Sequence, residues 1–277
     1  MALSEELRKD ADARKEIMNK ADLVFLCLPD AAAKEAVTFV TNPNTVVIDT
    51  STAHRTNDDW TYGFPELCGQ RGKIKKSKRI ANPGCHASGV IALVAPLIEK
   101  GVISKDVALS CFSITGYTGG GKKMIAEYEG DKPVTHLAPR QYGLTQTHKH
   151  IPEILKVCSL EQKPAFCPIV ADFARGMEVT VSLFGKDISC GIEEIKSIYQ
   201  NYYKSGVVYF NENASENGFL TANALANKDG MEISVHGNDE NVLLVARFDN
   251  LGKGASGAAI QNMNIVLGFD EKKGLNI

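Results

Sequence analysis

DLVFLCLPDAAAKEAVTFVTNPNTVVIDTS, residues 22–51, decides the fold because two uninterrupted apolar runs flank a stretch of helix-forming residues. Continuous apolar runs of this length are typical of strands buried on both faces of a parallel sheet. Strand, helix and strand within about thirty residues predict a βαβ unit, with Asp30 as the N-cap of a helix at 31–40. Ligands bind at the carboxyl ends of parallel strands. The expected binding edge therefore contains Pro29, Asp30, Asp49, Thr50 and Ser51.

The rest of the first half contains further helical and strand patterns. Residues 4–20 are polar and favour a helix, whereas residues 57–79 show no clear period. KRIA at 78–81 predicts a short strand. Apolar residues at helical spacing predict a helix over 85–100, which Pro96 should kink.

The second half is richer in strands. Strands are expected at 106–114, 206–210, 231–236 and 241–248, and helices near 191–204 and at 254–268. AFCPIVADF and GMEVTVSLF, separated by Ala174 and Arg175, predict a hairpin. The predicted class is α/β, with a Rossmann-like parallel-sheet domain over 1–84 and 253–277. An α+β domain with a mixed sheet is expected over 85–252.

Composition limits the possible functions. The 277 residues are 44% hydrophobic and 23% charged with a net charge of −2, so a soluble globular protein without nucleic-acid partners is expected. There is no apolar run of about 18 residues and no signal-peptide pattern, so no membrane partner is predicted. Seven cysteines are scattered without a CxxC pair, which indicates a reducing cytoplasm and predicts no metal site.

One cysteine stands apart from the others. The segment IANPGC (80–85) places Cys85 at the start of the helix expected at 85–100. Unpaired backbone N–H groups and the helix dipole at that position lower a thiol pKa, and Gly84 allows a tight turn that leaves the sulfur open. A buried structural thiol is the alternative, and it is the interpretation for Cys27, Cys111 and Cys167.

A nucleophilic cysteine needs a group that handles protons, and two histidines qualify. His148 and His150 lie in HKHIPE, just before an apparent helix, and in an extended chain both rings would face the same side. A metal site is less favoured because no third ligand follows at a familiar spacing. Each histidine could instead be an ordinary surface or core residue. His86 is notable only as the neighbour of the thiol.

Two further features could contact a ligand. GYTGGGKK (116–123) lets backbone amides approach a phosphate or a flat ring, although it does not fit the P-loop spacing and could be a flexible turn. Arg55, just beyond the second strand, could bind a phosphate or carboxylate with its planar fork, or be a solvated surface charge.

Six segments together carry a family likeness. They are IANPGC, SITGYTGGGKKMIAEYE, YGLTQTHKHIPEI, DNLGKGASGAAIQNMNIVLG, ADLVFLCLPDAAAKEAV and VIDTSTAHR. Taken in their order along the chain, they resemble the shorter form of the N-acetyl-γ-glutamyl-phosphate reductase family, over essentially the whole chain. Each motif is modest alone, and the order makes the resemblance specific.

The resemblance implies the reduction of N-acetyl-glutamyl 5-phosphate to the semialdehyde with NADPH, through a cysteine thioester, in arginine biosynthesis. It implies three groups of site residues: the catalytic Cys85, His148 and His150; the substrate-binding Ser51, Arg55 and Asn82; and the cofactor-binding Pro29, Gly116, Tyr117, Thr118, Gly119, Asn250 and Gly254. It also implies a small-molecule acyl phosphate substrate and a homo-oligomer, either a dimer or a tetramer.

The chain departs from the family pattern at two places. His86, Ala87 and Ser88 follow the cysteine where the family has Tyr-Pro-Thr. The family also begins with a strand and a glycine-rich turn that binds the cofactor pyrophosphate, and these are expected to be missing here. The alternatives are an aspartate-semialdehyde dehydrogenase, which HKHIPE and QNMN argue against, a non-catalytic binding remnant, or a cysteine hydrolase without a cofactor.

Overall fold

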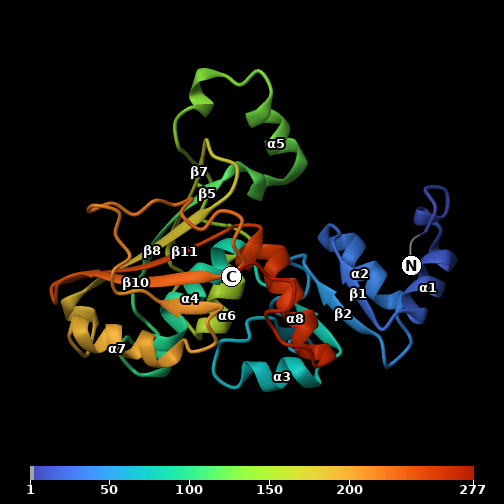
Figure 1. The fold of residues 1–277 in the computed structure, drawn as a ribbon, viewed down its shortest axis with the longest axis horizontal. Coiled ribbons are helices and arrows are strands. Elements are labelled where there is room, and N and C mark those ends of the chain that lie inside the picture. Colours follow the sequence, from blue (N-terminus) through green and yellow to red (C-terminus); the bar gives the residue numbers. More distant parts are fainter. Residues whose placement is uncertain (1–2) are drawn as a thin grey trace. The chain divides into compact units, whose positions relative to one another are not determined.

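The computed structural model describes residues 3–277 and divides them into two compact units (Figure 1). Unit 1 comprises the described residues up to Pro83 together with Ala259–Lys273. Unit 2 comprises Gly84–Ala258 and Gly274–Ile277. The chain therefore leaves unit 1 after Pro83 and returns to it through a C-terminal helix.

Unit 1 is built on a parallel sheet. Its elements are a 3-10 turn at Leu7–Lys9, α1 (Ala11–Lys20), β1 (Leu23–Leu26), α2 (Asp30–Phe39), β2 (Val46–Asp49), β3 (Thr61–Tyr62), α3 (Gln70–Lys76), β4 (Arg79–Ala81) and most of α8 (Gly257–Leu267). The strand order is β1-β2-β4-β3, and every pairing is parallel. The predicted βαβ unit of a Rossmann-like sheet is confirmed.

Apolar clusters on two sides of this sheet explain the uninterrupted hydrophobic runs. All four residues of β2 are buried. One cluster consists of Met18, Leu26, Ala36, Val40, Val47, Trp60 and Ala81. The other consists of Val46, Ile48, Ile74, Ile80, Ala259 and Ile265. The second cluster requires α8, so the C-terminal segment completes the core of unit 1.

The strand β1 is less buried than its sequence predicts. It pairs with β2 along one edge, and no strand within residues 3–277 pairs with its other edge. Phe25 is consequently 39% exposed. A groove of about 590 Å³ runs beside β1, lined by Leu3, Arg8, Lys9, Arg14, Ile17, Met18, Val24, Phe25, Leu26, Cys27, Leu28, Ala32 and Ala36. The expectation of complete burial on both faces was wrong because β1 is an edge strand.

The predicted N-cap role of Asp30 was also wrong. The helix α2 begins at Asp30 itself, and Pro29 occupies the N-cap position. The Asp30 carboxylate instead accepts hydrogen bonds from the backbone N–H of Thr52, at 2.9 Å, and from its hydroxyl. Asp30 thus ties the start of α2 to the turn that follows β2.

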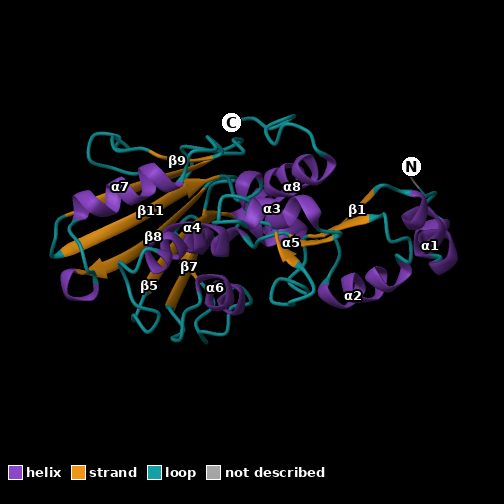
Figure 2. Cartoon of the chain, turned by 90° about the horizontal axis from the view of Figure 1, so that it is seen from below, coloured by secondary structure: helices purple, strands orange, loops and turns teal. Residues whose placement is uncertain are grey.

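Unit 2 contains a mixed sheet of seven strands with helices on one face. The strands are β5 (Ser110–Gly116), β6 (Arg140–Gln141), β7 (Ala165–Ala171), β8 (Met177–Phe184), β9 (Val208–Phe210), β10 (Met231–Gly237) and β11 (Asn241–Phe248), in the order β6-β7-β5-β8-β11-β10-β9. The helices are α4 (Cys85–Glu99), α5 (Gly121–Glu129), α6 (Ile151–Cys158) and α7 (Ile192–Tyr202). The helix α4 packs on β8 and β11, and α6 and α7 pack against α4 (Figure 2). The predicted α+β class of this half is confirmed.

The predicted hairpin of β7 and β8 does not form, because β5 lies between them. β5 pairs parallel with β7 and antiparallel with β8. The loop 172–176 crosses the end of β5, where Gly116 N–H donates to Gly176 O at 3.0 Å and Tyr117 N–H donates to Phe173 O at 3.0 Å. A Cβ at Gly116 would meet Ala174 O at 2.5 Å. Glycine is therefore required where the loop passes over β5.

The helix α4 continues through Pro96 because a second helix compensates for the missing N–H group. Proline at this position deprives the carbonyl of Ala92 of its helical hydrogen bond. The hydroxyl of Tyr203, at the end of α7, donates to Ala92 O at 2.6 Å. The conflict between the apolar helical pattern and its proline is thus resolved by a tertiary contact. No helix in the described part of the chain is both long and apolar enough to cross a membrane.

Candidate active site

The thiol of Cys85 stands at the first position of α4. Gly84 is the N-cap, with φ −78° and ψ 145°, and no side chain caps this helix end. The Ser88 N–H donates to Gly84 O at 2.8 Å, which closes the first turn. Cys85 is partly exposed, whereas eleven of the following residues of α4 are buried. The turn therefore presents one thiol at the positive end of an otherwise buried helix.

A buried carboxylate holds this turn in place. Glu153, on the first turn of α6, is only 1% exposed. Its Oε2 accepts a hydrogen bond from the Gly84 N–H at 3.2 Å, and its Oε1 lies 3.9 Å from Nε2 of His150. Glu153 thus contacts both the residue before the thiol and one candidate acid/base. The sequence analysis missed Glu153, although its place in HKHIPE, three residues after His150, was a usable signal.

The two histidines of HKHIPE lie together in unit 2. Their ring centroids are 4.7 Å apart at an interplanar angle of 84°, and His148 Nδ1 accepts a hydrogen bond from the His150 N–H at 3.2 Å. Burial, followed by the charge of Lys149, lowers the pKa of His148 to about 4. His148 is therefore neutral near pH 7.

A third histidine belongs to the same group. His86 is 3% exposed, and its ring centroid lies 5.6 Å from those of His148 and His150. Phe166 contacts both His86 and His148, with centroids 5.5 Å and 5.1 Å away. The sequence analysis assigned His86 no role, although its departure from the family residue beside the thiol marked the position.

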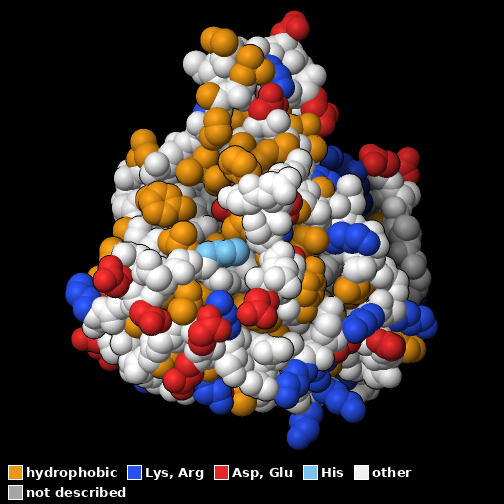
Figure 3. Space-filling model, turned by 60° about the vertical axis from the view of Figure 1, so that its left-hand side comes forward, with side chains coloured by type: hydrophobic (Ala, Val, Ile, Leu, Met, Phe, Trp, Pro, Cys, Tyr) orange, Lys and Arg blue, Asp and Glu red, His pale blue; other side chains and the backbone are white. Residues whose placement is uncertain are grey.

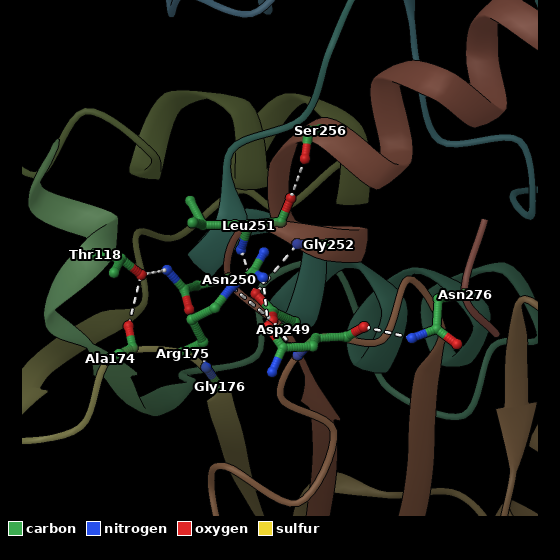
Figure 4. A network of polar contacts seen from close by, with 12 residues as sticks. Thr118, Ala174, Arg175, Gly176, Asp249, Asn250, Leu251, Gly252, Ser256 and Asn276 are labelled. Carbon is green, nitrogen blue, oxygen red and sulfur yellow. Dashed lines mark hydrogen bonds and ion pairs between the residues drawn. The ribbon is translucent and has the colours of Figure 1, made fainter. Parts of the chain in front are cut away.

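A polar network in unit 2 holds the glycine loop and the segment after β11 (Figure 4). Asn250 donates to the hydroxyl of Thr118 at 2.9 Å and accepts from the Gly176 N–H at 3.0 Å. The buried Asp249 accepts from the Leu251 N–H at 2.7 Å. It also forms an ion pair with Arg175 at 3.1 Å. The network fixes the turn at 249–256, which begins the C-terminal helix.

That turn brings a glycine against the thiol. A Cβ at Gly254 would lie 3.0 Å from Cβ of Cys85 and 3.1 Å from Asp249 O. Both contacts would be tight, so glycine is favoured at this approach. The GYTGGGKK segment differs from the expected loop, because Tyr117–Gly120 forms a 3-10 turn and α5 begins at Gly121. Gly121 has φ +72°, a conformation that glycine adopts without strain. The helix α5 lies beyond the ends of β5 and β7 (Figure 1), and the hydroxyl of its Tyr128 accepts hydrogen bonds from Arg140 of β6.

The remaining predicted residues lie in unit 1, where a buried aspartate organises the loop after β2. Asp49 accepts hydrogen bonds from the Ser51 N–H at 3.0 Å and from its hydroxyl at 2.7 Å. It also pairs with His54 Nδ1 at 2.6 Å, and the His54 ring stacks on Trp60 at 4.1 Å. His54 was another residue that the sequence analysis left without a role.

Arg55 is not a solvated surface charge. It is 9% exposed, and it donates to Asn82 O from Nε and to Thr50 O from a terminal nitrogen, each at 2.9 Å. Asn82 N–H in turn donates to Asp49 O at 2.7 Å. Unit 1 therefore groups Ser51, Arg55 and Asn82 at the carboxyl ends of β2 and β4, and Pro29 lies at the carboxyl end of β1. Unit 2 holds Cys85, His148, His150, Gly116, Tyr117, Thr118, Gly119, Asn250 and Gly254.

Two family models match the chain. Residues 3–77 match the NAD binding domain of semialdehyde dehydrogenase, and residues 85–250 match its dimerisation domain. Among curated proteins, N-acetyl-gamma-glutamyl-phosphate reductase of Brucella anthropi is 44% identical, over 97% of this chain and 90% of that protein. The protein of the same name from Sinorhizobium medicae is 44% identical over 96% of this chain and 90% of that protein.

Solved structures show the same fold at much lower identity. Aspartate semialdehyde dehydrogenase II from Vibrio cholerae superposes with a TM-score of 0.72 at 15% identity, covering 91% of this chain and 81% of that one. Aspartate semialdehyde dehydrogenase from Francisella tularensis gives a TM-score of 0.70 at 14% identity, with 93% and 85% coverage. At this identity the likeness concerns the fold alone.

Proposed function

Because this chain belongs to the semialdehyde dehydrogenase family, and within it to the N-acetyl-γ-glutamyl-phosphate reductases, we propose that it reduces N-acetyl-glutamyl 5-phosphate to N-acetyl-glutamate 5-semialdehyde, releasing phosphate, in arginine biosynthesis. The observation that carries the proposal is the thiol of Cys85 at the start of α4, in a turn hydrogen-bonded to the buried Glu153. A thiol that is activated in this way suits attack on an acyl phosphate.

In the proposed reaction, the Cys85 sulfur forms a bond to the acyl carbon while the bond from that carbon to the phosphate oxygen breaks. Phosphate leaves with the electron pair, and a thioester remains on Cys85. His150, beside Glu153, is the acid/base that takes the thiol proton, and His148 orients the substrate. Ser51, Arg55 and Asn82 bind the anionic groups of the substrate, for which the guanidinium fork of Arg55 is suited.

A bound nicotinamide cofactor, NADPH in this proposal, would supply the hydride for reduction of the thioester to the aldehyde, and Cys85 would leave as the thiolate. The absence of a side chain at Gly254 supports a cofactor contact there, because a Cβ at this residue would lie only 3.0 Å from Cβ of Cys85 and glycine presents its backbone instead. Gly116, Tyr117, Thr118, Gly119, Asn250 and Gly254 of unit 2, with Pro29 of unit 1, are the proposed contacts of the cofactor.

Substrate choice tests the proposed function. We expect purified protein to consume NADPH with N-acetyl-glutamyl phosphate at least roughly tenfold faster, in kcat/KM, than with aspartyl phosphate, because the named relatives at 44% identity share this acyl substrate. The rate is followed by the absorbance of NADPH. A preference for aspartyl phosphate would instead support the aspartate-semialdehyde alternative, and turnover of neither would support the non-catalytic one.

We also propose that the protein is a homo-oligomer formed through the outer face of the large sheet. A Cβ at Gly89 of α4 would lie 2.5 Å from the side chain of Val179, so Val179 of β8 faces α4. Because side chains alternate between the two faces along a strand, the neighbours of Val179 on β8, and the residues paired with these neighbours, face away from the helices. On that outer face Phe112, Phe184 and Leu243 are 46%, 52% and 41% exposed. Figure 3 shows hydrophobic side chains gathered on the face it presents. The match of 85–250 to a dimerisation domain supports a second copy as the occupant.

A charge on the outer face should dissociate this oligomer. We expect Phe112→Glu to halve or quarter the particle mass measured by light scattering, because burying an unpaired carboxylate against apolar side chains is unfavourable. Val134→Glu, on the 3-10 turn after α5, introduces the same charge at an exposed apolar residue elsewhere and should leave the mass unchanged. Equal masses for the parent and Phe112→Glu would contradict this choice of interface.

The cysteines support a reducing compartment, and we propose that the protein works in the cytoplasm. None of the seven forms a disulfide, and five of them, Cys27, Cys68, Cys85, Cys167 and Cys190, are exposed or partly exposed. Persistent exposed thiols are typical of a reducing environment.

A further inference from the structure

A buried carboxylate that the proposed reaction does not use stands at the end of β2. Asp49 is fully buried. Its Oδ1 accepts a hydrogen bond from the Ser51 N–H at 3.0 Å, and its Oδ2 accepts from the Ser51 hydroxyl at 2.7 Å and from His54 Nδ1 at 2.6 Å. A buried carboxylate needs such donors, and here they all come from the loop that follows β2.

These contacts fix the directions of the donors. A carboxylate can only accept hydrogen bonds, so the protons of the Ser51 hydroxyl and of His54 Nδ1 both point to Asp49. The His54 ring is also held on its face, because it stacks on Trp60 with the two planes 13° from parallel. Both donors of Ser51 are thus directed to Asp49, so the guanidinium of Arg55 is the donor of the proposed substrate group that suits an anion best.

Arg55 is held by backbone carbonyls at two ends of the same turn. Its Nε donates to Asn82 O and a terminal nitrogen donates to Thr50 O, each at 2.9 Å. The Asn82 N–H donates in turn to the backbone carbonyl of Asp49 at 2.7 Å. The peptide bond from Asp49 to Thr50 closes this ring of contacts. At that point the hydrogen bond from the Ser51 N–H to the Asp49 side chain fixes the turn, in the manner of an Asx-turn.

We propose that Asp49 is a positioning residue that acts through Arg55. Its carboxylate fixes the turn that presents Thr50 O to the guanidinium, and so it sets where Arg55 meets the anionic group of the substrate. That Arg55 binds this group rests on the proposed function. Asp49 does not itself contact the substrate, because its side chain is fully buried.

The kinetic test compares two substitutions of Asp49. Asp49→Ala removes every acceptor of the side chain and should raise KM for the acyl phosphate at least roughly tenfold, with kcat changed less than about twofold. Asp49→Asn keeps one oxygen. Because the Ser51 N–H is a backbone donor whose direction cannot reverse, the amide oxygen should face it and preserve the turn. We therefore expect Asp49→Asn to keep KM within roughly threefold of the parent protein.

A second measurement needs no substrate. The Nε–H of Arg55 gives its own nuclear magnetic resonance signal, and its hydrogen bond to Asn82 O slows exchange with water. Exchange should be at least roughly tenfold faster in Asp49→Ala and close to the parent rate in Asp49→Asn. Thr45→Val is the matched control, since it loses a buried hydroxyl bond to Ala21 O just before β2, at the opposite end of the strand from Asp49. It should leave both KM and the exchange rate unchanged.

A double variant separates action through Arg55 from an independent effect. Arg55→Lys loses the planar fork and should itself raise KM, and Asp49→Ala/Arg55→Lys should have the same KM as Arg55→Lys alone. Increases in KM that multiply in the double variant would overturn the proposal. An equal rise in Asp49→Ala and Asp49→Asn would overturn it too, because the charge and not the turn would then be responsible.

The remaining outcomes are also decisive. Should Asp49→Ala fail to fold, as judged by circular dichroism, Asp49→Val fills the space without an acceptor and must show the raised KM and the faster exchange in its place. Unchanged KM and unchanged exchange in the folded variant would overturn the proposal. A parent protein that reduces no acyl phosphate would refute the proposed function, and the exchange rate of the Arg55 Nε–H would then decide whether Asp49 positions Arg55.

Discussion

Replacement of Cys85 by serine is expected to lower kcat at least roughly 10³-fold, because an alkoxide is a far poorer attacking and leaving group than a thiolate. Cys85 lies at the first position of α4, next to a turn that Glu153 holds, so the loss should be chemical and the fold should survive. NADPH oxidation measures turnover, and mass spectrometry of protein quenched after mixing with the acyl phosphate measures the thioester. Neither signal should remain in Cys85→Ser.

A matched cysteine variant and a labelling experiment are the controls for this prediction. Cys190→Ser changes a partly buried thiol in the same unit and should keep full activity. In the parent protein at mildly acidic pH, iodoacetamide should label Cys85 before Cys111 or Cys158, because burial raises the pKa of the Cys111 thiol to about 12 and raises that of Cys158 as well. If peptide mapping finds another cysteine labelled first, or if Cys85→Ser retains a tenth of the activity, Cys85 is not the nucleophile.

The second large effect concerns cofactor affinity and the open edge of β1. We expect residues 1–277 to accept acyl groups on Cys85 but to bind NADPH weakly, because pyrophosphate binding draws on a glycine-rich turn between a strand and a helix. Within the described residues no such turn precedes β1, and the groove beside this strand is lined by apolar side chains together with Arg8, Lys9 and Arg14. Extension of the N-terminus by a strand and a glycine-rich turn should tighten NADPH binding at least tenfold.

Titration followed by NADPH fluorescence measures the affinity for the cofactor, and thioester trapping on the same sample measures acylation of Cys85. A matched extension in which each glycine of the turn is replaced by valine keeps the length and the strand but blocks close approach of a phosphate. It should not tighten binding. Submicromolar NADPH binding by residues 1–277 would contradict the expectation, and so would equal gains from both extensions.

Patterns that act over a few residues allowed much of the fold to be predicted. The βαβ unit, the helix that starts at Cys85 and the strands near 231–248 are where periodicity and turn residues place them. The pairing of β7 was mispredicted because a short loop between two strands favours a hairpin. No sequence pattern near β7 and β8 indicates that β5 lies between them. The exposure of β1 was missed for a similar reason, since its apolar run does not reveal which edges carry a partner.

The residues of the candidate site likewise include some that could be predicted from the sequence and some that could not. The position of Cys85 could be inferred because Asn-Pro-Gly before an apolar helix has a local meaning. Sequence position could draw attention to Glu153 and His86, but the roles of Glu153, His86 and His54 could not be inferred, because these roles depend on partners distant in sequence or on burial that only the tertiary structure provides. A single glutamate or histidine in a sequence is typically an ordinary surface or core residue, and only the contact with Gly84, Tyr142 or Asp49 distinguishes these three.

The return of residues 259–273 to unit 1 has a consequence for how the protein is made. Ile48, Ile74 and Ile80 pack against Ala259 and Ile265, and Gln261 and Asn262 bond to Glu66 and Gly63. During synthesis the first eighty residues leave the ribosome well before these partners do. Unit 1 must therefore wait, with one side of its sheet uncovered, while unit 2 is translated and can fold. A nascent chain released before α8 emerges would expose that apolar side and be a substrate for chaperones.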